Sequence, residues 1–412
     1  MNPAYLLIKI LFVGTIATSF VGRCVHAADV YITAEFNADL SNPQKNEFTN
    51  TTPWSGVCLQ NHIDVCKSNN WWSIATGIKG TKKVVPADIP GRGAFHIGFP
   101  GKRRLIVRSL ENHEYPLDLI ITGAALRLKD RTLTHADPTF DYNPIPTAAC
   151  KQALSNNAAG NYSVMRMYLR KDNGESSLGC STSSLATPLL AMPYSIEDFD
   201  VVYRMITPSP LEMLPGEYEG SVTYSVGGSL ANDFDLGNGA NPNDTSLTLH
   251  FHIKVKHAFY VEFIAPHMRA ILQLDGGWTQ WTDYGRIPSR LTQEIPFNIS
   301  SSSVFKISLD CEYPQPDGRC AIADTTNTRQ VVPVDVSVSM PGIIEESTHR
   351  PAANTALNVS PTEFSTDHLI VRSKRSYLNF KVQNQTDITQ MLNTPGKLYK
   401  GNVRVIFDAG ID

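Results

Sequence analysis

The last residues of the chain place the strongest constraint on its fold. In segment 398–412, LYKGNVRVIFDAGID, apolar and mixed positions alternate with the period of a β-strand. The apolar face consists of Val403, Val405, Phe407, Ala409 and Ile411. Such a face belongs inside a sandwich, yet no later segment of this sequence follows to pair with it. Because an unpaired apolar strand promotes aggregation, the pattern predicts strand addition from another chain, or else the ordinary closing strand of a complete sandwich.

The rest of the sequence predicts an all-β protein in two parts. The chain holds 26 prolines and 27 glycines, and short apolar runs alternate with turn-rich gaps. The clearest strand is LTLHFHIKV at 247–255, and a second alternation, FYVEF, begins at residue 259. Such a short join is expected where one sandwich leads directly into another, so we expect a boundary near residue 257. Earlier in the chain, the composition of residues 130–160 predicts a loop with a helical turn over 147–154.

Several segments resemble one group of known proteins. YKGNVRV at 399–405 resembles the carboxyl-terminal strand of chaperone–usher pilus subunits. LPGEYEGSVTYSV at 214–226, the strand at 247–255 and AFYVEFIAP at 258–266 resemble two-domain tip adhesins of the alternate-chaperone branch, including the class five fimbrial adhesins. The resemblance covers residues 211–412. The family usually has an aromatic residue next to last, where this chain has Ile411, so the register of the terminal strand stays open.

The resemblance implies two immunoglobulin-like β-sandwich domains in tandem. Residues 28–257 would be a receptor-binding adhesin domain, and residues 258–412 a pilin domain that lacks its last strand. A periplasmic chaperone would lend the missing strand, and the neighbouring pilin subunit would replace it during assembly at the outer-membrane usher. Main-chain hydrogen bonds would provide affinity and alternate side chains would fill the acceptor face. The residues expected to contact the donated strand are Tyr399, Val403, Val405 and Phe407.

The amino terminus predicts a secretory signal over residues 1–27. Lys9 ends a short polar start, the mostly apolar run 10–21 is too short to span a bilayer comfortably, and residues 25–27 suit cleavage before Ala28. A retained amino-terminal anchor is the alternative. Export, together with the pilin resemblance, predicts passage through the periplasm to a fimbrial tip on the cell surface.

Six of the seven cysteines follow this segment, and an even number in an exported chain predicts disulfides. Six cysteines allow fifteen pairings. Proximity in the sequence favours three short-range pairs, namely Cys58 with Cys66, Cys150 with Cys180, and Cys311 with Cys320. No CxxC pair occurs, which disfavours zinc or redox sites.

Signatures of catalysis are missing from the sequence. It contains no GxSxG, Walker, HExxH or GxGxxG motif. His250 and His252 share one strand face and could meet on a metal, but no further ligand lies at suitable spacing, so we expect a solvated sheet face. The net charge of −3 gives no support for nucleic-acid binding. We therefore expect no enzyme, metal or cofactor, with a β-sandwich glycosidase as the remaining enzymatic alternative.

A basic segment is the candidate receptor site. Between residues 79 and 108 there are eight lysines and arginines and one acid, Asp88. Guanidinium groups suit the carboxylates and sulfates of acidic glycans, and an indole can stack on a sugar ring. The hypothesis is that Trp71, Trp72, Arg103 and Arg104 bind an acidic host glycan or glycoprotein. The alternative is a solvated face with two tryptophans in the core.

The sequence as a whole predicts a fimbrial tip adhesin. The alternative is a structural minor pilin that starts or caps the fibre without binding a receptor. The strand DVYITAEF at 29–36 adds a second question, because its alternation suits either a first strand or a donor extension. A donor extension would place the subunit inside the fibre.

Overall fold

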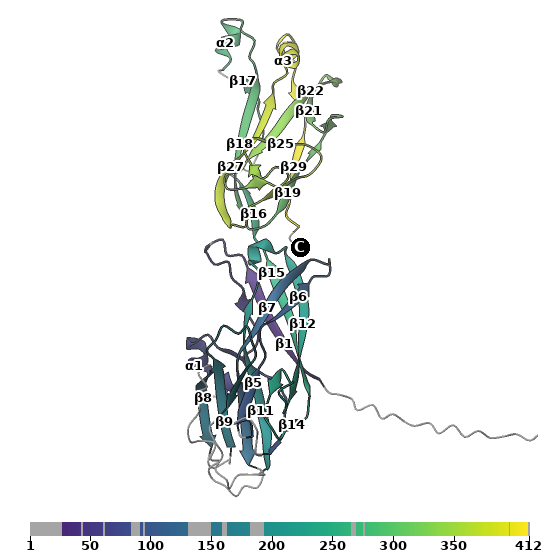
Figure 1. The fold of residues 1–412 in the computed structure, drawn as a ribbon. Coiled ribbons are helices and arrows are strands. Elements are labelled where there is room, and N and C mark those ends of the chain that lie inside the picture. Colours follow the sequence, from purple (N-terminus) through teal and green to yellow (C-terminus); the bar gives the residue numbers. More distant parts are fainter. Residues whose placement is uncertain are drawn as a thin grey trace, which may run out of the picture.

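The computed structural model describes residues 27–42, 44–60, 62–83, 91–93, 95–130, 150–158, 163–181, 193–264, 269–274, 277–394 and 396–410, and all structural statements below refer to them. Strands β1–β15 and β16–β29 form separate sheets, called here the N-terminal unit and the C-terminal unit. The two units are stacked end to end, so the molecule is elongated (Figure 1). Residues 1–26, which hold almost all of the expected signal segment, lie outside the described residues.

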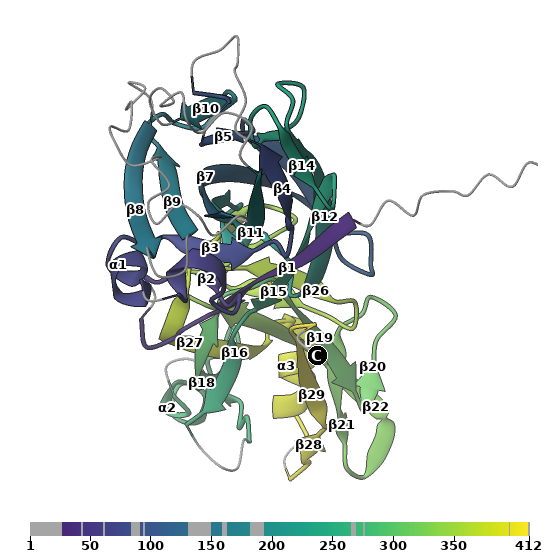
Figure 2. The same cartoon turned by 90° about the horizontal axis from the view of Figure 1, so that it is seen from below.

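The N-terminal unit is built around one long, curled sheet. Its order is β14-β4-β11-β7-β6-β12-β15-β1-β2, and residues from distant strands of that order, such as Ile32 and Ile196, share one core. The sheet therefore folds over on itself, as the view along the molecule shows (Figure 2). Its strands are β1 (Ala27–Asn37), β2 (Thr49–Asn50), β3 (Trp72–Ala75), β4 (Gly80–Lys83), β5 (His96–Phe99), β6 (Arg103–Arg108), β7 (Glu114–Asp130), β8 (Cys150–Ala158), β9 (Ser163–Arg170), β10 (Leu178–Ser181), β11 (Pro193–Ile206), β12 (Gly216–Gly227), β13 (Phe234–Asp235), β14 (Ala240–Pro242) and β15 (Ser246–Lys256). Its helices are α1 (Ile63–Ser68) and the 3-10 turns η1 (Gly56–Cys58) and η4 (Pro210–Glu212).

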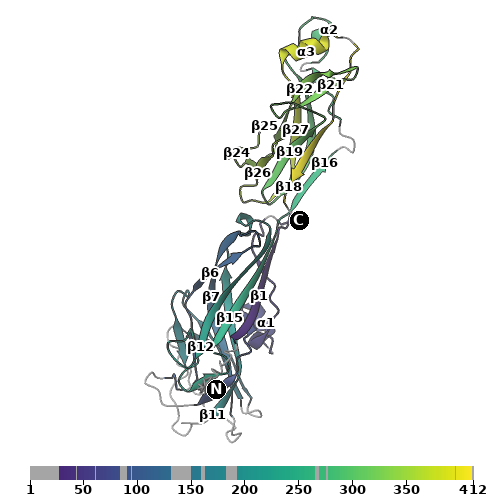
Figure 3. The same ribbon diagram turned by 90° about the vertical axis from the view of Figure 1, so that its right-hand side faces the viewer.

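Strand β15 has a partner on each edge. It pairs antiparallel with β12 and parallel with β1, which runs beside it over its whole length (Figure 3). Its inward residues, from Leu247 to Val255, are at most 2% exposed. The inward residues Ile32, Ala34 and Phe36 of β1 are buried in the same core. In this structure the segment DVYITAEF is thus a strand of its own unit.

The prediction of a helical turn over 147–154 is wrong for its described part, which begins at residue 150. Residues 150–158 form β8, which pairs antiparallel with β9, while the preceding part of the expected loop lies outside the described residues. Pairing with β9 and the disulfide from Cys150 to Cys180 outweigh the weak strand propensity of this polar segment.

The C-terminal unit contains two larger sheets over a second core. One sheet has the order β16-β18-β27-β22-β21-β20, and the other has the order β24-β23-β26-β19-β29. Its strands are β16 (Phe259–Phe263), β17 (Gln273–Leu274), β18 (Leu291–Ser301), β19 (Phe305–Cys311), β20 (Tyr313–Pro314), β21 (Cys320–Asp324), β22 (Asn327–Ser339), β23 (Ile344–Glu345), β24 (Arg350–Pro351), β25 (Thr355–Leu357), β26 (Thr362–Ser365), β27 (Val371–Val382), β28 (Tyr399–Lys400) and β29 (Val403–Asp408). Its helices are α2 (Thr279–Thr282) and α3 (Gln385–Leu392). Strands dominate both units, so the all-β prediction is confirmed.

A buried histidine joins the two units. His257 Nε2 donates a hydrogen bond to the Met213 carbonyl oxygen over 2.8 Å, and Nδ1 lies 3.1 Å from the Ser302 hydroxyl. Because a carbonyl oxygen only accepts, Nε2 carries the proton and Nδ1 accepts from Ser302. Burial lowers the pKa of His257. Burial therefore favours the neutral imidazole, and the ring forms hydrogen bonds to both units.

The six cysteines form the pairs expected from their proximity: Cys58–Cys66, Cys150–Cys180 and Cys311–Cys320. In the described part of the chain, no helix is long and apolar enough to cross a membrane.

Candidate functional site

Strands β16 and β29 each lie at one end of a sheet in the C-terminal unit and have a free edge, and β20 and β24 lie at the opposite ends. Strand β29 pairs with β19, strand β16 pairs with β18, and no other described strand pairs with either. The two strands face each other across the core, since the rings of Phe263 and Phe407 lie 6.4 Å apart between centroids and that of Phe297 contacts both. Unpaired main-chain groups therefore border a shared apolar region, which is the chemistry that an added strand requires.

The inward side chains of β16 and β29 are covered only in part. Exposure alternates along both strands, and the inward positions are half-buried rather than buried. This set packs against the second core and consists of Phe259, Val261, Phe263, Val403, Val405, Phe407 and Ala409. A strand laid between the two edges would complete both ladders and cover these side chains. We call this region the open strand position.

The predicted contact residues divide between two strands. Val403, Val405 and Phe407 point inward from β29 and border the open strand position. Tyr399 lies on β28, which pairs with β21 through Asp324 instead. Its hydroxyl is buried and has no hydrogen-bond partner among the described residues. Tyr399 is therefore separated from the other three by the bend at 401–402.

The N-terminal unit has a large surface pocket that contains both predicted tryptophans. The pocket has a volume of about 1090 Å³. It is lined by segments 46–50, 69–72 and 203–210, by residues of β7, by the end of β9, and by Asp172 and Asn173 just after β9. Trp72 stacks on Trp54, with 4.1 Å between ring centroids, whereas Trp71 makes no ring contact with a described residue. We call this cavity the Trp71 pocket.

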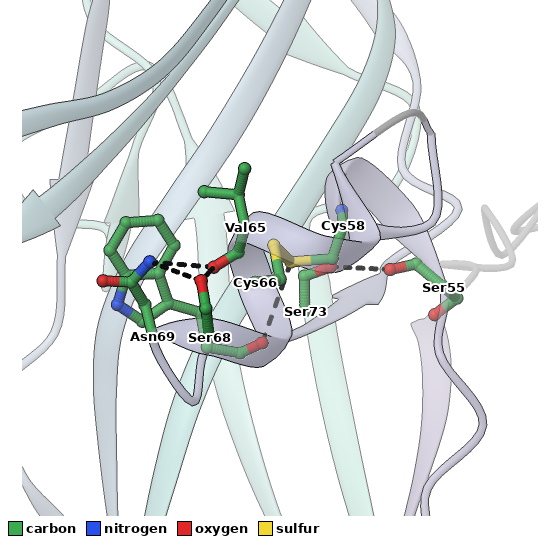
Figure 4. Close-up of a disulfide and its surroundings, with 8 residues drawn as sticks. Ser55, Cys58, Val65, Cys66, Ser68, Asn69 and Ser73 are labelled. Carbon is green, nitrogen blue, oxygen red and sulfur yellow. Dashed lines mark hydrogen bonds between the residues drawn. A yellow bond between two sulfur atoms is a disulfide. The ribbon is translucent and has the colours of Figure 1, made fainter.

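A disulfide-bonded turn positions Trp71. The bond between Cys58 and Cys66 anchors α1, and the Trp71 N–H donates to the Cys66 carbonyl oxygen over 2.9 Å. Asn69 Nδ2 donates to the Val65 carbonyl oxygen over 2.8 Å and also contacts Ser68 (Figure 4). These bonds fix the end of α1, so the direction of the indole depends on the disulfide.

The base of the same turn rests on a buried acid. Asp200 accepts the main-chain N–H of Val57, and burial raises its pKa to about 7. Gly56 has φ +67°, and a Cβ there would lie 2.7 Å from Asp200 Cγ. Only glycine fits this close approach, which seats the turn on β11.

The polar groups at one side of the pocket are held in fixed directions. Tyr203 donates its hydroxyl hydrogen to Thr52 Oγ1 over 3.0 Å and accepts a 2.8 Å hydrogen bond from Asn50 Nδ2. Asn50 Oδ1 in turn accepts the Thr52 N–H over 3.0 Å. Neither Asn50 nor Tyr203 stands out in the sequence as a candidate binding residue. A side-chain network across 153 positions leaves no local signal in a sequence.

The charges around the pocket balance. Arg170 pairs with Asp172 at 2.5 Å, and this pairing lowers the pKa of the Asp172 carboxyl. Arg170 also donates to the Pro100 carbonyl oxygen over 2.9 Å, so its side chain is committed internally. Glu47 and Arg204 are exposed and have no ion-pair partner among the described residues. The lining thus carries two cations and two anions.

Arg103 and Arg104 lie elsewhere, on β6, and neither lines the Trp71 pocket. Arg103 pairs with Asp233 and lies 4.5 Å above the ring of Tyr224. Arg104 donates two hydrogen bonds to Asp118, at 2.7 and 3.0 Å, which lowers the pKa of that carboxyl. The structure therefore brings the two tryptophans together but separates them from the two arginines.

Other cations of the basic segment are also committed. Lys82 is buried, and its Nζ donates to the Leu236 carbonyl oxygen over 2.8 Å. Burial lowers its pKa to about 7. Arg92 pairs with Asp235 through two hydrogen bonds, at 2.7 and 2.9 Å. Acids from distant strands thus neutralise much of a segment that looks strongly basic in sequence.

The two histidines of β15 pair with acids on neighbouring strands. His250 Nε2 lies 2.8 Å from Asp29 on β1, and His252 Nε2 lies 3.3 Å from Glu217 on β12. Across the described ranges, no group of three or more potential ligands is placed to hold a metal ion.

No protein-family model and no curated protein matches this sequence. Among solved structures, a chaperone–tip adhesin complex of CFA/I fimbriae biogenesis is 9% identical, with 81% of this chain and 84% of that chain covered and a TM-score of 0.27. The CsuC–CsuE chaperone–tip adhesion subunit complex of the archaic Csu pili of Acinetobacter baumannii is 10% identical, with coverages of 93% and 98% and a TM-score of 0.23. CfaE, the adhesive subunit of CFA/I fimbria of enterotoxigenic Escherichia coli, is 9% identical, with coverages of 93% and 92% and a TM-score of 0.25. The three solved structures named here contain fimbrial adhesins.

Proposed function

We propose that this protein is a fimbrial tip adhesin. Residues 258–412 form the pilin domain that joins the fibre by accepting a strand, and residues 28–257 form the domain that binds a host-surface receptor. The role is binding rather than catalysis. The protein is exported through the periplasm, where a chaperone fills the open strand position before a neighbouring subunit does so at the usher.

The observation that carries the proposal is the open strand position. Free edges of β16 and β29 border half-buried apolar side chains, among them Val405 and Phe407. Leaving such a region uncovered costs about 25 cal/mol for each Å² of apolar surface and invites aggregation. A donated strand removes both costs through main-chain bonds and side-chain burial.

A tip location is supported by β1. A subunit inside a fibre must offer a strand to its neighbour, but β1 is paired with β15 and its inward side chains, such as Ile32, are buried. Releasing it would expose the core of its own unit. The Trp71 pocket then favours an adhesin over a minor pilin without a receptor, because it supplies a large cavity with oriented polar groups.

The test of the fibre-joining role uses the double variant Val403→Asp with Val405→Asp. Both charges enter the open strand position, so the tagged chain should no longer be recovered in a stable complex with a chaperone from the periplasm of the cells that make it. The matched control is Ile406→Asp, which places the same charge on the outward face of β29. Recovery of the double variant in normal amounts without any bound partner would contradict the proposal, because the C-terminal unit would then be complete by itself.

The test of receptor binding is separate. This assay uses only the wild-type chain in complex with its chaperone. The complex should bind host cells saturably. A correctly assembled complex that binds no cells would favour the minor pilin.

A further inference from the structure

We propose that the Trp71 pocket binds an uncharged glycan, with the indole of Trp71 as the surface on which a sugar ring stacks. The inference rests on the proposed receptor-binding role of residues 28–257, and it adds the location of the site and the chemical class of the ligand. The sequence suggested an acidic glycan bound in part by Arg103 and Arg104. The present proposal is a neutral glycan in the Trp71 pocket, which contains neither arginine.

The size and the position of the pocket suit an oligosaccharide. Its volume of about 1090 Å³ is at the upper limit of ordinary small-molecule sites, which measure roughly 300–1,000 Å³. Segments 46–50, 69–72 and 203–210 converge on it from three parts of the chain. A cavity of this size with several walls has room for more than one sugar unit.

Trp71 is the lining aromatic residue that is available for stacking. Trp72 already stacks on Trp54, and Phe48 packs edge-on against Phe36 with 6.3 Å between ring centroids. The Tyr203 ring is buried with its hydroxyl bonded to Thr52. Trp71 is half-buried, so one part of the indole packs against the protein while another part faces the pocket. The apolar face of a sugar ring packs well on such a surface because both are flat and carry C–H groups.

The polar groups of the pocket match hydroxyl groups better than charges. Asparagine side chains contribute amides from three segments, at Asn50, Asn69 and Asn173, and each is already oriented by a hydrogen bond within the protein. An amide both donates and accepts, as a sugar hydroxyl does. Fixed directions reduce the entropy lost when the ligand binds.

The charge balance argues against an acidic ligand. A sialic acid or sulfate would require an uncompensated cation, and Arg170 is committed to Asp172 and to main-chain carbonyl groups. Arg204 is the remaining lining cation, and Glu47 lines the same pocket with the opposite charge. The lining therefore carries no net charge, which suits a neutral oligosaccharide better than an anion.

The experiment measures the full chain, in complex with the protein that completes its open strand position, on an array of immobilised neutral oligosaccharides. Each neutral glycan is paired with its sialylated or sulfated counterpart. We expect binding to at least one neutral member that is equal to or stronger than binding to its acidic counterpart. Trp71→Ala should weaken this binding at least about tenfold, while Trp71→Phe should retain most of it because the ring remains.

Two matched controls locate the site. Arg104→Ala removes an exposed arginine of β6 outside the pocket and should leave binding unchanged. Arg204→Ala removes the unpaired lining cation and should change binding less than about threefold for a neutral ligand. Folding of every variant is checked by recovery of the complex and by hydrogen exchange in β15.

The outcomes separate this inference from the proposed function. Binding only to acidic glycans, with a large loss in Arg204→Ala, would overturn the chemical class. Glycan binding that survives in a folded Trp71→Ala variant would overturn the site. Binding to host cells without binding to any glycan would overturn the inference and leave the adhesin role intact, whereas a folded complex that binds neither cells nor glycans would overturn both.

Discussion

Strands β15 and β29 have nearly the same sequence pattern but different surroundings. Both alternate apolar inward residues with outward ones, which are all polar in β15 but include Ile406 in β29. Strand β15 lies between β12 and β1, and its inward residues are buried, whereas β29 has β19 on one edge and half-buried inward residues. The difference arises from β1, which lies parallel beside β15 and has no counterpart beside β29 among the described strands.

The two units differ in how the edges of these strands are covered. A parallel strand from the start of the N-terminal unit closes its own sheet. In the C-terminal unit the first strand, β16, pairs with β18, so the edge of β29 stays open. Under the proposed function, the N-terminal unit would bind its receptor independently of assembly, while the C-terminal unit would require a partner.

The largest expected effect breaks this asymmetry by making the N-terminal unit incomplete. Ile32→Asp places a charge at a position of β1 that is 0% exposed and should cost more than about 4 kcal/mol. Hydrogen exchange of the β15 amides should become fast. Tyr31→Asp is the control, since Tyr31 is exposed on the outer face of β1 and should cause little change. Unchanged protection of β15 in Ile32→Asp would show that β1 does not complete the unit.

The next effect compares two short disulfide loops, one in each unit. Cys58–Cys66 spans 8 positions and Cys311–Cys320 spans 9, so each should contribute roughly 2–3 kcal/mol locally. Replacing Cys58 and Cys66 with serine should release the Trp71 turn and weaken receptor binding without affecting chaperone recovery. Replacing Cys311 and Cys320 should have the reverse effect, because Cys311 lies on β19, the partner of β29. Identical effects of the two changes on both assays would contradict the independence of the units.

A smaller effect concerns the pH dependence of the stability of the N-terminal unit. The pKa of Asp200 is raised by burial from 3.8 to about 7, so the folded state favours the protonated carboxyl. Its contribution to stability should therefore decrease as pH rises from about 4 to about 7. Asp200→Asn should stabilise the N-terminal unit at pH 8 by about 1–3 kcal/mol and have little effect at pH 4. Thermal unfolding at the two pH values measures this difference, and an equal shift at both would contradict it.

The smallest effect concerns the junction of the units and has the opposite sign. Burial lowers the pKa of His257 below its ordinary value of 6.5, so the folded state favours the neutral imidazole. Stability at the junction should fall as pH decreases through 6.5, because protonation removes the acceptor for Ser302. Wild type should lose a small part of its thermal stability between pH 7.5 and pH 5. His257→Gln should lose less over the same range, and an equal loss in both would exclude the histidine as the cause.

Much of the fold was predictable because it depends on local alternation. The strand at 247–255, the terminal strand, and the pairing of nearby cysteines all follow from periods and spacings that neighbouring residues impose. Segment 150–158 was not predictable, because its strand depends on pairing with β9 and a bond to Cys180. The Trp71 pocket was predictable only in part, since Asn50 and Tyr203 meet through the fold.

The sequence by itself determined that this is an all-β chain with an apolar strand near its end, because alternation and turn residues act locally. Only the tertiary structure decided which edges are free and which charges are neutralised. Arg104 looks free in the sequence, but β7 brings Asp118 against it. Likewise, β15 and β29 have similar patterns, yet one acquires β1 and the other has an open edge. Pairing between distant strands depends on topology, and a local pattern does not specify it.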